Sequence, residues 1–352
     1  MTPLGQLIAA RIAATGPINL ADYMTDCLLH PQHGYYATRD PFGAQGDFVT
    51  APEISQMFGE LIGLALAQSW LDQGAPAQIV LAELGPGRGT LMADILRATA
   101  GVPGFAAAAR VHLVEASPRL RQVQARIVPT ASWHRTTATL PDAPLYLIGN
   151  EFFDALPIRQ FVRDGAGWRE RMIGLTGGEL VWGLTAATAL GQLGHRLTDT
   201  KDGDLVEFCP ALPPIVADIG RRIGQFGGAA LIIDYGDWRS QGDTLQAVQG
   251  HARADPLAAP GMADLTAHVD FEAIAMACAP ARHTRLTPQG VFLGRLGITA
   301  RAEKLAAGLA GPGLDTHLAA HRRLTHPGEM GHLFKVMGVL PDHTPPLPGL
   351  ET

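Results

Sequence analysis

The segment "QIVLAELGPGRGTLMADILRATA", residues 78–100, combines a short apolar run, three closely spaced glycines and a helical pattern. An apolar run that ends in glycines predicts a buried strand, and the pattern that follows predicts a helix beginning at the turn. Two further apolar runs, "VHLVEAS" and "PLYLIGNE", follow at the spacing of β-α-β units, and "AALIIDYG" comes later. We therefore expect an α/β fold with a mostly parallel sheet and helices on both faces.

The glycines of the turn, Gly85, Gly87 and Gly89, would let the backbone approach a ligand closely. The third comes one position earlier than in the dinucleotide-binding fingerprint, and Glu83 stands two residues before the first. A carboxylate there repels a pyrophosphate and attracts an ammonium group, so we expect S-adenosyl-L-methionine rather than NAD. Glu115, which ends the next strand, would accept hydrogen bonds from ribose hydroxyls. The alternatives are a tight turn without a ligand and a solvated acid at the strand end.

The composition argues against several classes of protein. The net charge of -6 and the lack of a dense basic tract disfavour nucleic acid, and no apolar run approaches the roughly 18 residues of a membrane span. Cys27, Cys209 and Cys278 are isolated, so neither a metal site nor a disulfide framework is indicated. Basic residues are nearly all arginine, and the N-terminus reads as neither a signal nor a transit peptide. We expect a bacterial cytoplasmic protein.

Six blocks of the sequence resemble the MidA family: "HGYYATRDPFGAQGDFVTAPEISQMFGELIG", "ELGPGRGTL", "VHLVEASPRL", "NEFFDALP", "IIDYG" and "PGMADLTAHVDF". The match runs from about Asp22 to "LFKVMGVL" near the C-terminus. The resemblance implies a class I S-adenosylmethionine-dependent methyltransferase with a seven-stranded sheet, a helical N-terminal cap and an insertion before the fifth strand. It also implies that the last two strands form a hairpin, which we expect "HLFKVMGVL" to supply.

The family includes a mitochondrial complex I assembly factor with arginine methyltransferase activity. The resemblance therefore implies methylation of an arginine in a protein substrate, with a subunit of respiratory complex I as the candidate partner. Three other functions stay open: a non-catalytic S-adenosylmethionine-binding assembly factor, a small-molecule methyltransferase and, with less support, a dinucleotide oxidoreductase. The stretch "QAVQGHARADP" lacks the denser basic and aromatic character of other members, so the resemblance implies no function for this loop.

The stretch "NEFFDALP" would place Asn150, Glu151 and Asp154 at the end of the fourth strand of this fold. Methyl transfer from a sulfonium is an in-line displacement that needs alignment and no metal. A guanidinium stays protonated, and carboxylates can hold it bidentately. We expect Glu151 and Asp154 to be catalytic and Asn150 to bind the methionine end of the cofactor. Alternatively, a backbone amide satisfies Glu151, Asp154 is a turn or N-cap residue, and Asn150 is a cap.

Other polar residues have two interpretations each. Thr50 and Glu53, in "GDFVTAPEIS", either close over the cofactor or belong to a loop in which Glu53 starts a helix. His268 is either a base near the acceptor or a structural residue, and Asp270 is expected to cap a helix.

The chain divides into two expected parts. Residues 1–75 would form the helical cap with its cofactor-covering loop, and residues 76–352 the methyltransferase domain. Insertions are expected at about 158–227 and 239–330. The first contains "WRERMIGLTGGELVWGL", which predicts an antiparallel hairpin, and the second begins with an irregular stretch.

Overall fold

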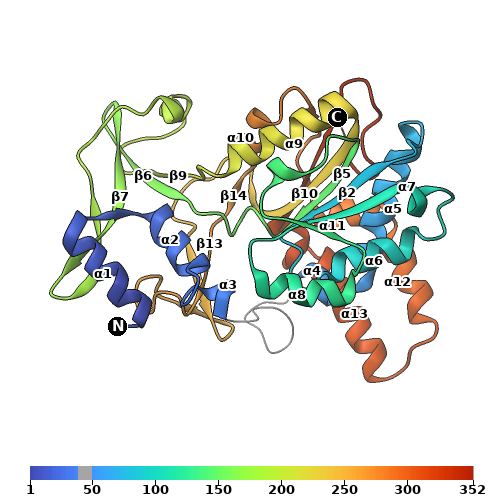
Figure 1. The fold of residues 1–352 in the computed structure, drawn as a ribbon, viewed down its shortest axis with the longest axis horizontal. Coiled ribbons are helices and arrows are strands. Elements are labelled where there is room, and N and C mark those ends of the chain that lie inside the picture. The colour runs from blue at the N-terminus through green and yellow to red at the C-terminus, as the bar shows by residue number, and fades with distance from the viewer. Residues whose placement is uncertain (39–49, 352) are drawn as a thin grey trace.

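The computed structural model describes residues 1–38 and 50–351, in which a main α/β sheet stands beside a smaller antiparallel sheet (Figure 1). Residues 39–49, part of the loop expected to cover the cofactor, lie outside the described residues. In spatial order the main sheet contains β15 (Arg282–His283), β17 (Phe334–Leu340), β10 (Gly228–Asp237), β5 (Leu145–Asn150), β2 (Ile79–Leu84), β3 (Ala109–Val114) and β4 (Ser132–His134). The strands from β10 to β4 are parallel, and β17 is antiparallel to β10. This arrangement confirms the expected α/β fold with a mostly parallel sheet, in which seven strands follow one another in order.

The last strand of the sheet differs in one respect from the expectation. The segment "HLFKVMGVL" supplies only β17, and its edge partner β15 comes about fifty residues earlier in the chain. Two short strands, β14 (Val269–Asp270) and β16 (Thr287–Pro288), add to β10 and β17. The expected hairpin of sequence neighbours was therefore wrong, because four helices, α11 to α14, separate the two strands.

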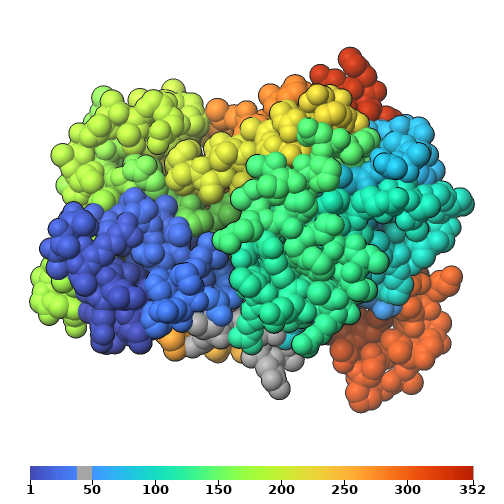
Figure 2. Space-filling model, viewed as in Figure 1, coloured from blue at the N-terminus to red at the C-terminus, as the bar shows by residue number. Residues whose placement is uncertain are grey.

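Helices cover both faces of the main sheet, which explains why every residue of β2 is buried. One face packs against α5 (Gln56–Asp72), α6 (Thr90–Thr99), α11 (Gln289–Arg295) and α12 (Ile298–Ala306). The other face packs against α9 (Leu212–Phe226) and α10 (Phe271–Ala277). The remaining helices around this sheet are α4 (Ala51–Ile54), α7 (Phe105–Ala108), α8 (Pro118–Ile127), α13 (Pro312–Thr325) and α14 (Met330–Leu333). Figure 2 shows the orange segment of α12 and α13 projecting from the body at the lower right.

The second part of the molecule, called here the antiparallel lobe, is built from three separate stretches of chain. Its sheet consists of β1 (Ile18–Asn19), β6 (Arg159–Asp164), β7 (Gly167–Thr176), β8 (Glu179–Leu184) and β9 (Leu205–Phe208). The predicted hairpin forms β7 and β8, with Gly177 and Gly178 at its turn. The N-terminal helices α1 (Pro3–Thr15), α2 (Leu20–Leu29) and α3 (Tyr35–Thr38) also belong to this lobe.

The stretch after β10, expected to be irregular, contributes a third sheet to the antiparallel lobe. It consists of β11 (Gln246–Gln249), β12 (Ala252–Ala254) and β13 (Asp264–Thr266). Leu265 of β13 is buried in the same core as Leu20 and Tyr23 of α2. These strands are short and separated by glycines and prolines, so they carry little periodicity in the sequence. Among the helices that the structure describes, none has the length and apolar character needed to cross a membrane.

Candidate active site

A cavity of about 290 Å³ lies at the carboxyl edge of the main sheet, where the parallel strands β2, β3 and β5 all end. Gly85, Gly87, Glu115 and Glu151 line it from the sheet side. The facing wall comes from the antiparallel lobe and includes Leu28, Leu29 and Tyr36. A smaller cavity of about 30 Å³ shares Gly85, Gly87 and Glu151 with the first. The two form one candidate site that the sheet and the lobe build together.

The glycine turn after β2 approaches both cavities with its backbone. Gly85, Gly87 and Gly89 have φ values of 57°, 53° and 90°, which is the left-handed region that glycine adopts without strain. A Cβ atom on Gly85 would lie 2.9 Å from Cδ2 of Phe152, so a side chain there would also collide with the turn after β5. The turn thus requires glycine for both conformation and space, and α6 begins directly after it.

Two residues that line the smaller cavity carry buried acceptors without a donor among the described residues. Glu83 and Asn150 line it, and no group within residues 1–38 and 50–351 donates to Oε2 of Glu83 or Oδ1 of Asn150. Burial raises the pKa of Glu83 to about 8, although a hydrogen bond from the backbone N–H of Met92 lowers it. An ammonium group brings three donors and a positive charge, and would satisfy both acceptors. These residues therefore fit the amino-acid end of S-adenosyl-L-methionine.

Glu115 is buried at the wall of the larger cavity rather than solvated. Its Oε1 accepts a 2.7 Å hydrogen bond from the N–H of Ser117, and its Oε2 accepts one of 3.2 Å from Nε2 of Gln124. Burial raises the pKa of Glu115, while these two donors act in the opposite direction. The carboxylate is held at the position where the ribose of the expected cofactor would lie.

Gln124 of α8 connects the two halves of this cofactor site, and sequence reasoning missed it. Its fully buried amide donates both to Oε2 of Glu115 and to the carbonyl of Gly87, at 2.8 Å, while its Oε1 accepts from Nε1 of Trp133 at 2.9 Å. One side chain thus fixes the glycine turn relative to the strand-end acid. A glutamine among the many polar residues of α8 gives no sequence signal, because only the tertiary fold shows that it is buried.

We expect Gln124→Leu to weaken S-adenosylhomocysteine binding by about tenfold, since the substitution removes the Gln124 donor from the Gly87 carbonyl and from Oε2 of Glu115. Calorimetric titration measures this change. The exposed neighbour Gln122 provides the matched control, and Gln122→Leu should bind like the wild type. Equal affinities for the two variants would show that Gln124 does not organise the site.

Glu151 stands directly after β5, at the wall shared by both cavities. Its φ of 51° is left-handed, which costs a non-glycine residue about 1–2 kcal/mol. Its Oε1 accepts hydrogen bonds from the N–H of Ala51 at 3.0 Å and from Nδ2 of Asn150 at 3.1 Å. The alternative, in which a backbone amide satisfies the acid, therefore holds for Oε1 of Glu151 only. No described residue donates a hydrogen bond to its Oε2. Burial, followed by the nearby Asp154, raises the pKa of Glu151 to about 7.

Asp154 does not line either cavity and lies behind the wall. It is buried in a turn, no helix begins at it, and its Oδ1 has no partner among the described residues. Burial raises its pKa to about 6, while a hydrogen bond from Tyr235 lowers it. Of the two carboxylates expected to act together, the structure places only Glu151 at the cavity surface.

Three further residues near Glu151 escaped the sequence analysis. Asp234 of β10 accepts hydrogen bonds from the backbone of the turn that carries Glu151 and Asp154. The hydroxyl of Tyr36 donates to Asp264 at 3.0 Å, which ties the cavity wall to β13. The signal that could have identified Asp234 is a carboxylate inside the apolar run "LIIDYG", since a charge in a buried strand needs a specific partner.

The remaining candidates lie at the edges of this site or away from it. Thr50 lines the smaller cavity, and Glu53 does so in the first turn of α4, where its Oε1 accepts a 2.6 Å hydrogen bond from Thr90. His268 is not brought to the cofactor cavities, and its ring packs edge-on against Tyr235 with centroids 5.4 Å apart. Asp270 caps α10, as predicted.

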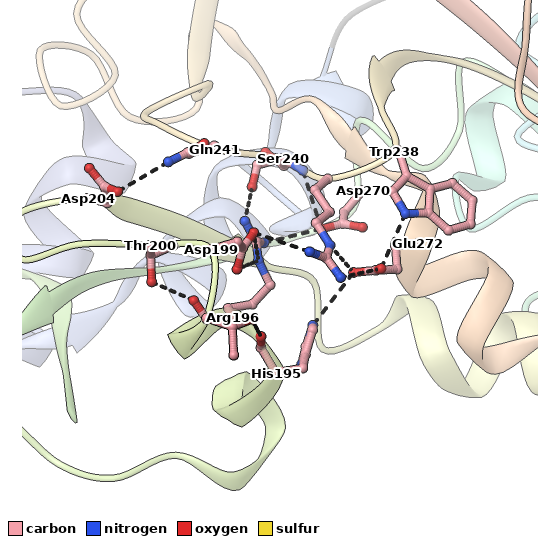
Figure 3. A network of polar contacts seen from close by, with 12 residues as sticks. His195, Arg196, Asp199, Thr200, Asp204, Trp238, Ser240, Gln241, Asp270 and Glu272 are labelled. Carbon is pink, nitrogen blue, oxygen red and sulfur yellow. Dashed lines mark hydrogen bonds and ion pairs between the residues drawn. The ribbon is translucent and has the colours of Figure 1, made fainter. Parts of the chain in front are cut away.

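A third cavity, of about 390 Å³, lies away from the glycine turn, between the antiparallel lobe and helices α9 and α10. Figure 3 shows that charged groups around it are paired with one another. Arg196 bonds Asp199 and the carbonyl of Ser240, and Glu272 accepts from Arg239 and Trp238. None of the unsatisfied buried atoms of the described residues belongs to its lining. The unsatisfied buried acceptors of Glu83 and Asn150 instead belong to residues that line the cavity at the glycine turn, which makes the cavities at the carboxyl edge of the main sheet the better cofactor site.

Comparisons with known proteins identify the family of the chain and its cofactor. The sequence model of a family described as S-adenosyl-L-methionine-dependent methyltransferases matches residues 61–289. The "Protein arginine methyltransferase NDUFAF7, mitochondrial" of Mus musculus is 35% identical over 97% of this chain and 85% of its own length. The protein of the same name from Danio rerio is 36% identical over 95% of this chain and 86% of its own length. A crystal structure from Burkholderia thailandensis with bound S-adenosyl-homocysteine has a TM-score of 0.83 and 29% identity, covering 98% of this chain and 94% of that one.

Proposed function

Because the chain belongs to the MidA family of S-adenosyl-L-methionine-dependent methyltransferases, we propose that it transfers a methyl group to an arginine of a protein. S-adenosyl-L-methionine is the cofactor of this family. Two facts support the finer statement. The relatives are named protein arginine methyltransferases, and the site at Glu151 has the charge that a cationic acceptor needs.

The observation that carries the proposal is the pair of carboxylates without a cationic partner. Neither Glu151 nor Asp154 forms an ion pair with a basic side chain of the described residues, and each keeps an oxygen without a donor there. Unpaired carboxylates removed from water are costly unless a ligand supplies the missing positive charge. A cationic acceptor entering from the cavity would supply it.

A guanidinium fits these carboxylates better than an ammonium does. A lysine must lose its proton before its nitrogen can attack, and neighbouring carboxylates raise the pKa of an ammonium. A guanidinium stays protonated at neutral pH, and a carboxylate holds that form through two parallel hydrogen bonds. The unsatisfied Oε2 of Glu151 and its bonded Oε1 are placed to accept such a fork.

Each residue of the site then has a defined task. When bound, S-adenosyl-L-methionine supplies an electrophilic methyl group on a sulfonium. Glu83 and Asn150 hold the amino-acid end, and Glu115 and the glycine turn hold the nucleoside. Glu151 aligns the acceptor nitrogen, which gains the methyl carbon and gives up one N–H proton, and a carboxylate with a pKa of about 7 can accept that proton. Asp154 adds negative charge from behind the wall.

The proposed partner is a protein, and the resemblance to the family makes a subunit of respiratory complex I the first candidate. Mass spectrometry of methylated peptides from cells with and without the gene tests this directly. We expect methylarginine at one or a few sites, including a complex I subunit, to disappear with the gene. Unchanged methylarginine in all proteins would overturn the proposal.

A second measurement separates the other functions. Purified protein is incubated with S-adenosyl-L-methionine carrying a radiolabelled methyl group and an extract of cells that lack the gene. Label in the protein fraction supports the proposal, and label confined to small molecules indicates a small-molecule methyltransferase. No transfer together with retained S-adenosylhomocysteine binding indicates an assembly factor that only binds the cofactor.

A further inference from the structure

We propose that Asp234 is a positioning residue of the active site, whose carboxylate holds the turn at residues 151–154 and thereby sets the place of Glu151 and Asp154. Asp234 lies on β10, in the main sheet next to β5, and is fully buried. It touches neither cavity. The inference rests on the proposed function, since it takes Glu151 as the carboxylate that binds the acceptor.

The carboxylate of Asp234 collects four backbone N–H groups. Its Oδ2 accepts from Phe152 at 3.2 Å, from Phe153 at 2.9 Å and from Asp154 at 3.3 Å. Its Oδ1 accepts from the N–H of Tyr235 at 3.0 Å. Three consecutive N–H groups of a turn can converge on one oxygen only if the chain reverses sharply there. The side chain of Asp234 thus serves as the centre around which the turn folds.

This turn is where the backbone leaves β5 in an unfavourable conformation. Glu151 is left-handed, and its own N–H donates to the carbonyl of Ile233 at 3.0 Å, the residue before Asp234. The ladder bond to Ile233 and the three bonds to Asp234 therefore hold Glu151 from both sides. Without the Asp234 bonds the residue would relax toward ordinary strand geometry, which swings its side chain away from the cavity wall.

The surroundings of Asp234 favour a carboxylate over an amide. All four neighbours are N–H donors, so an Asn would place its NH₂ group against one of them. Burial, together with Asp154 and Glu151, raises the pKa of Asp234, and the donors oppose this. The titratable and charged groups around it are Glu151 and Asp154 on the turn, Tyr235 on β10, Lys335 opposite it on β17 and, acting on Glu151, Arg323 on α13.

The test compares Asp234→Asn and Asp234→Ala with Asp237→Asn, which removes an exposed carboxylate from the same strand. S-adenosylhomocysteine affinity is measured by calorimetry, and methyl transfer with the radiolabelled cofactor and the extract of cells lacking the gene. We expect kcat to fall by about tenfold in Asp234→Asn and on the order of a hundredfold in Asp234→Ala. Cofactor affinity should stay within about threefold of wild type, because Asp234 does not reach the cofactor cavities.

The pH profile provides a readout that a merely structural role would not move. In Asp234→Asn the acidic limb of the rate should shift to lower pH, because a Glu151 side chain released from the cavity wall loses part of the burial that raises its pKa to about 7. Rates equal to those of Asp237→Asn, or a loss of cofactor affinity in parallel with the rate, would overturn the inference.

A crystal structure of Asp234→Asn with S-adenosylhomocysteine tests the role of Asp234 independently of the proposed function, because it shows the position of the Glu151 carboxylate directly. If the wild type transfers no methyl group to protein, the proposed function fails, and the inference is then decided by the turn. A displaced Glu151 carboxylate supports it, and an unchanged one refutes it.

Discussion

Replacing Glu151 by Gln should lower methyl transfer to protein by at least about a hundredfold while leaving S-adenosylhomocysteine affinity nearly unchanged. Gln keeps the size of the side chain, and its oxygen can still accept from the N–H of Ala51, so the wall of the cavity should persist. What is lost is the negative charge that holds a guanidinium and accepts its proton. The measurement is single-turnover transfer at saturating cofactor, with calorimetry as the control for binding.

The pH dependence gives the same prediction a second readout. Glu151 must be ionised to bind the acceptor, so kcat/KM of the wild type should rise with pH through an apparent pKa near 7, and this limb should be absent in Glu151→Gln. Full activity of the variant, or an unchanged limb, would remove Glu151 from the mechanism.

Replacing Glu83 by Gln should weaken S-adenosylhomocysteine binding by about a hundredfold or more. Glu83 lines the smaller cavity and its buried Oε2 has no donor among the described residues. The proposed ion pair with the cofactor ammonium is shielded from water, where the loss of one charge is expensive. The exposed Glu303 of α12 supplies the control, since Glu303→Gln removes the same charge far from the glycine turn. If both variants bind alike, the amino-acid end of the cofactor does not lie at Glu83.

The same substitution should stabilise the cofactor-free protein at alkaline pH. The pKa of Glu83 is raised from its ordinary value near 4.5 to about 8, so the folded state binds a proton that the unfolded state has lost between these values. The loss of folding stability caused by ionising the buried Glu83 is absent below pH 4.5, grows as the pH rises and is complete above pH 8. The melting temperature of Glu83→Gln should therefore exceed that of the wild type at pH 8.5 and match it at pH 4.5. A melting temperature of Glu83→Gln below that of the wild type at pH 8.5 would contradict the raised pKa of Glu83.

Most parts of this site that the sequence predicted lie at the carboxyl ends of strands. Glu83, Glu115 and Glu151 each interrupt or end an apolar run, and the glycine turn follows the first run directly. Because parallel strands end at one edge, their order along the chain is enough to predict that these residues converge. The family resemblance added the cofactor and the strand order, and the sheet confirmed the fold class.

The parts that were not predicted depend on contacts between distant segments. Gln124 and Asp234 act on backbone groups more than thirty residues away, and Tyr36 reaches Asp264 across 228 positions. No local period or spacing encodes such pairs. Asp154 is the opposite case. Its position three residues after Glu151 predicted that both carboxylates would face the same cavity, but the sharp turn places Asp154 behind the cavity wall.

The core of the antiparallel lobe joins residues that lie far apart in the sequence, so the lobe folds late during synthesis of the chain. Its core joins Leu4 and Tyr23 to Ile173 and to Leu265, so it cannot close on a ribosome until about three quarters of the chain has emerged. Contacts of such sequence separation also slow folding. Leu28 and Tyr36, which line the larger cavity of the candidate site opposite the glycine turn, belong to this lobe. The main sheet needs a still later segment, because its strand β17 follows Leu265 in the chain. A nascent chain therefore becomes competent to enclose its cofactor only late in synthesis.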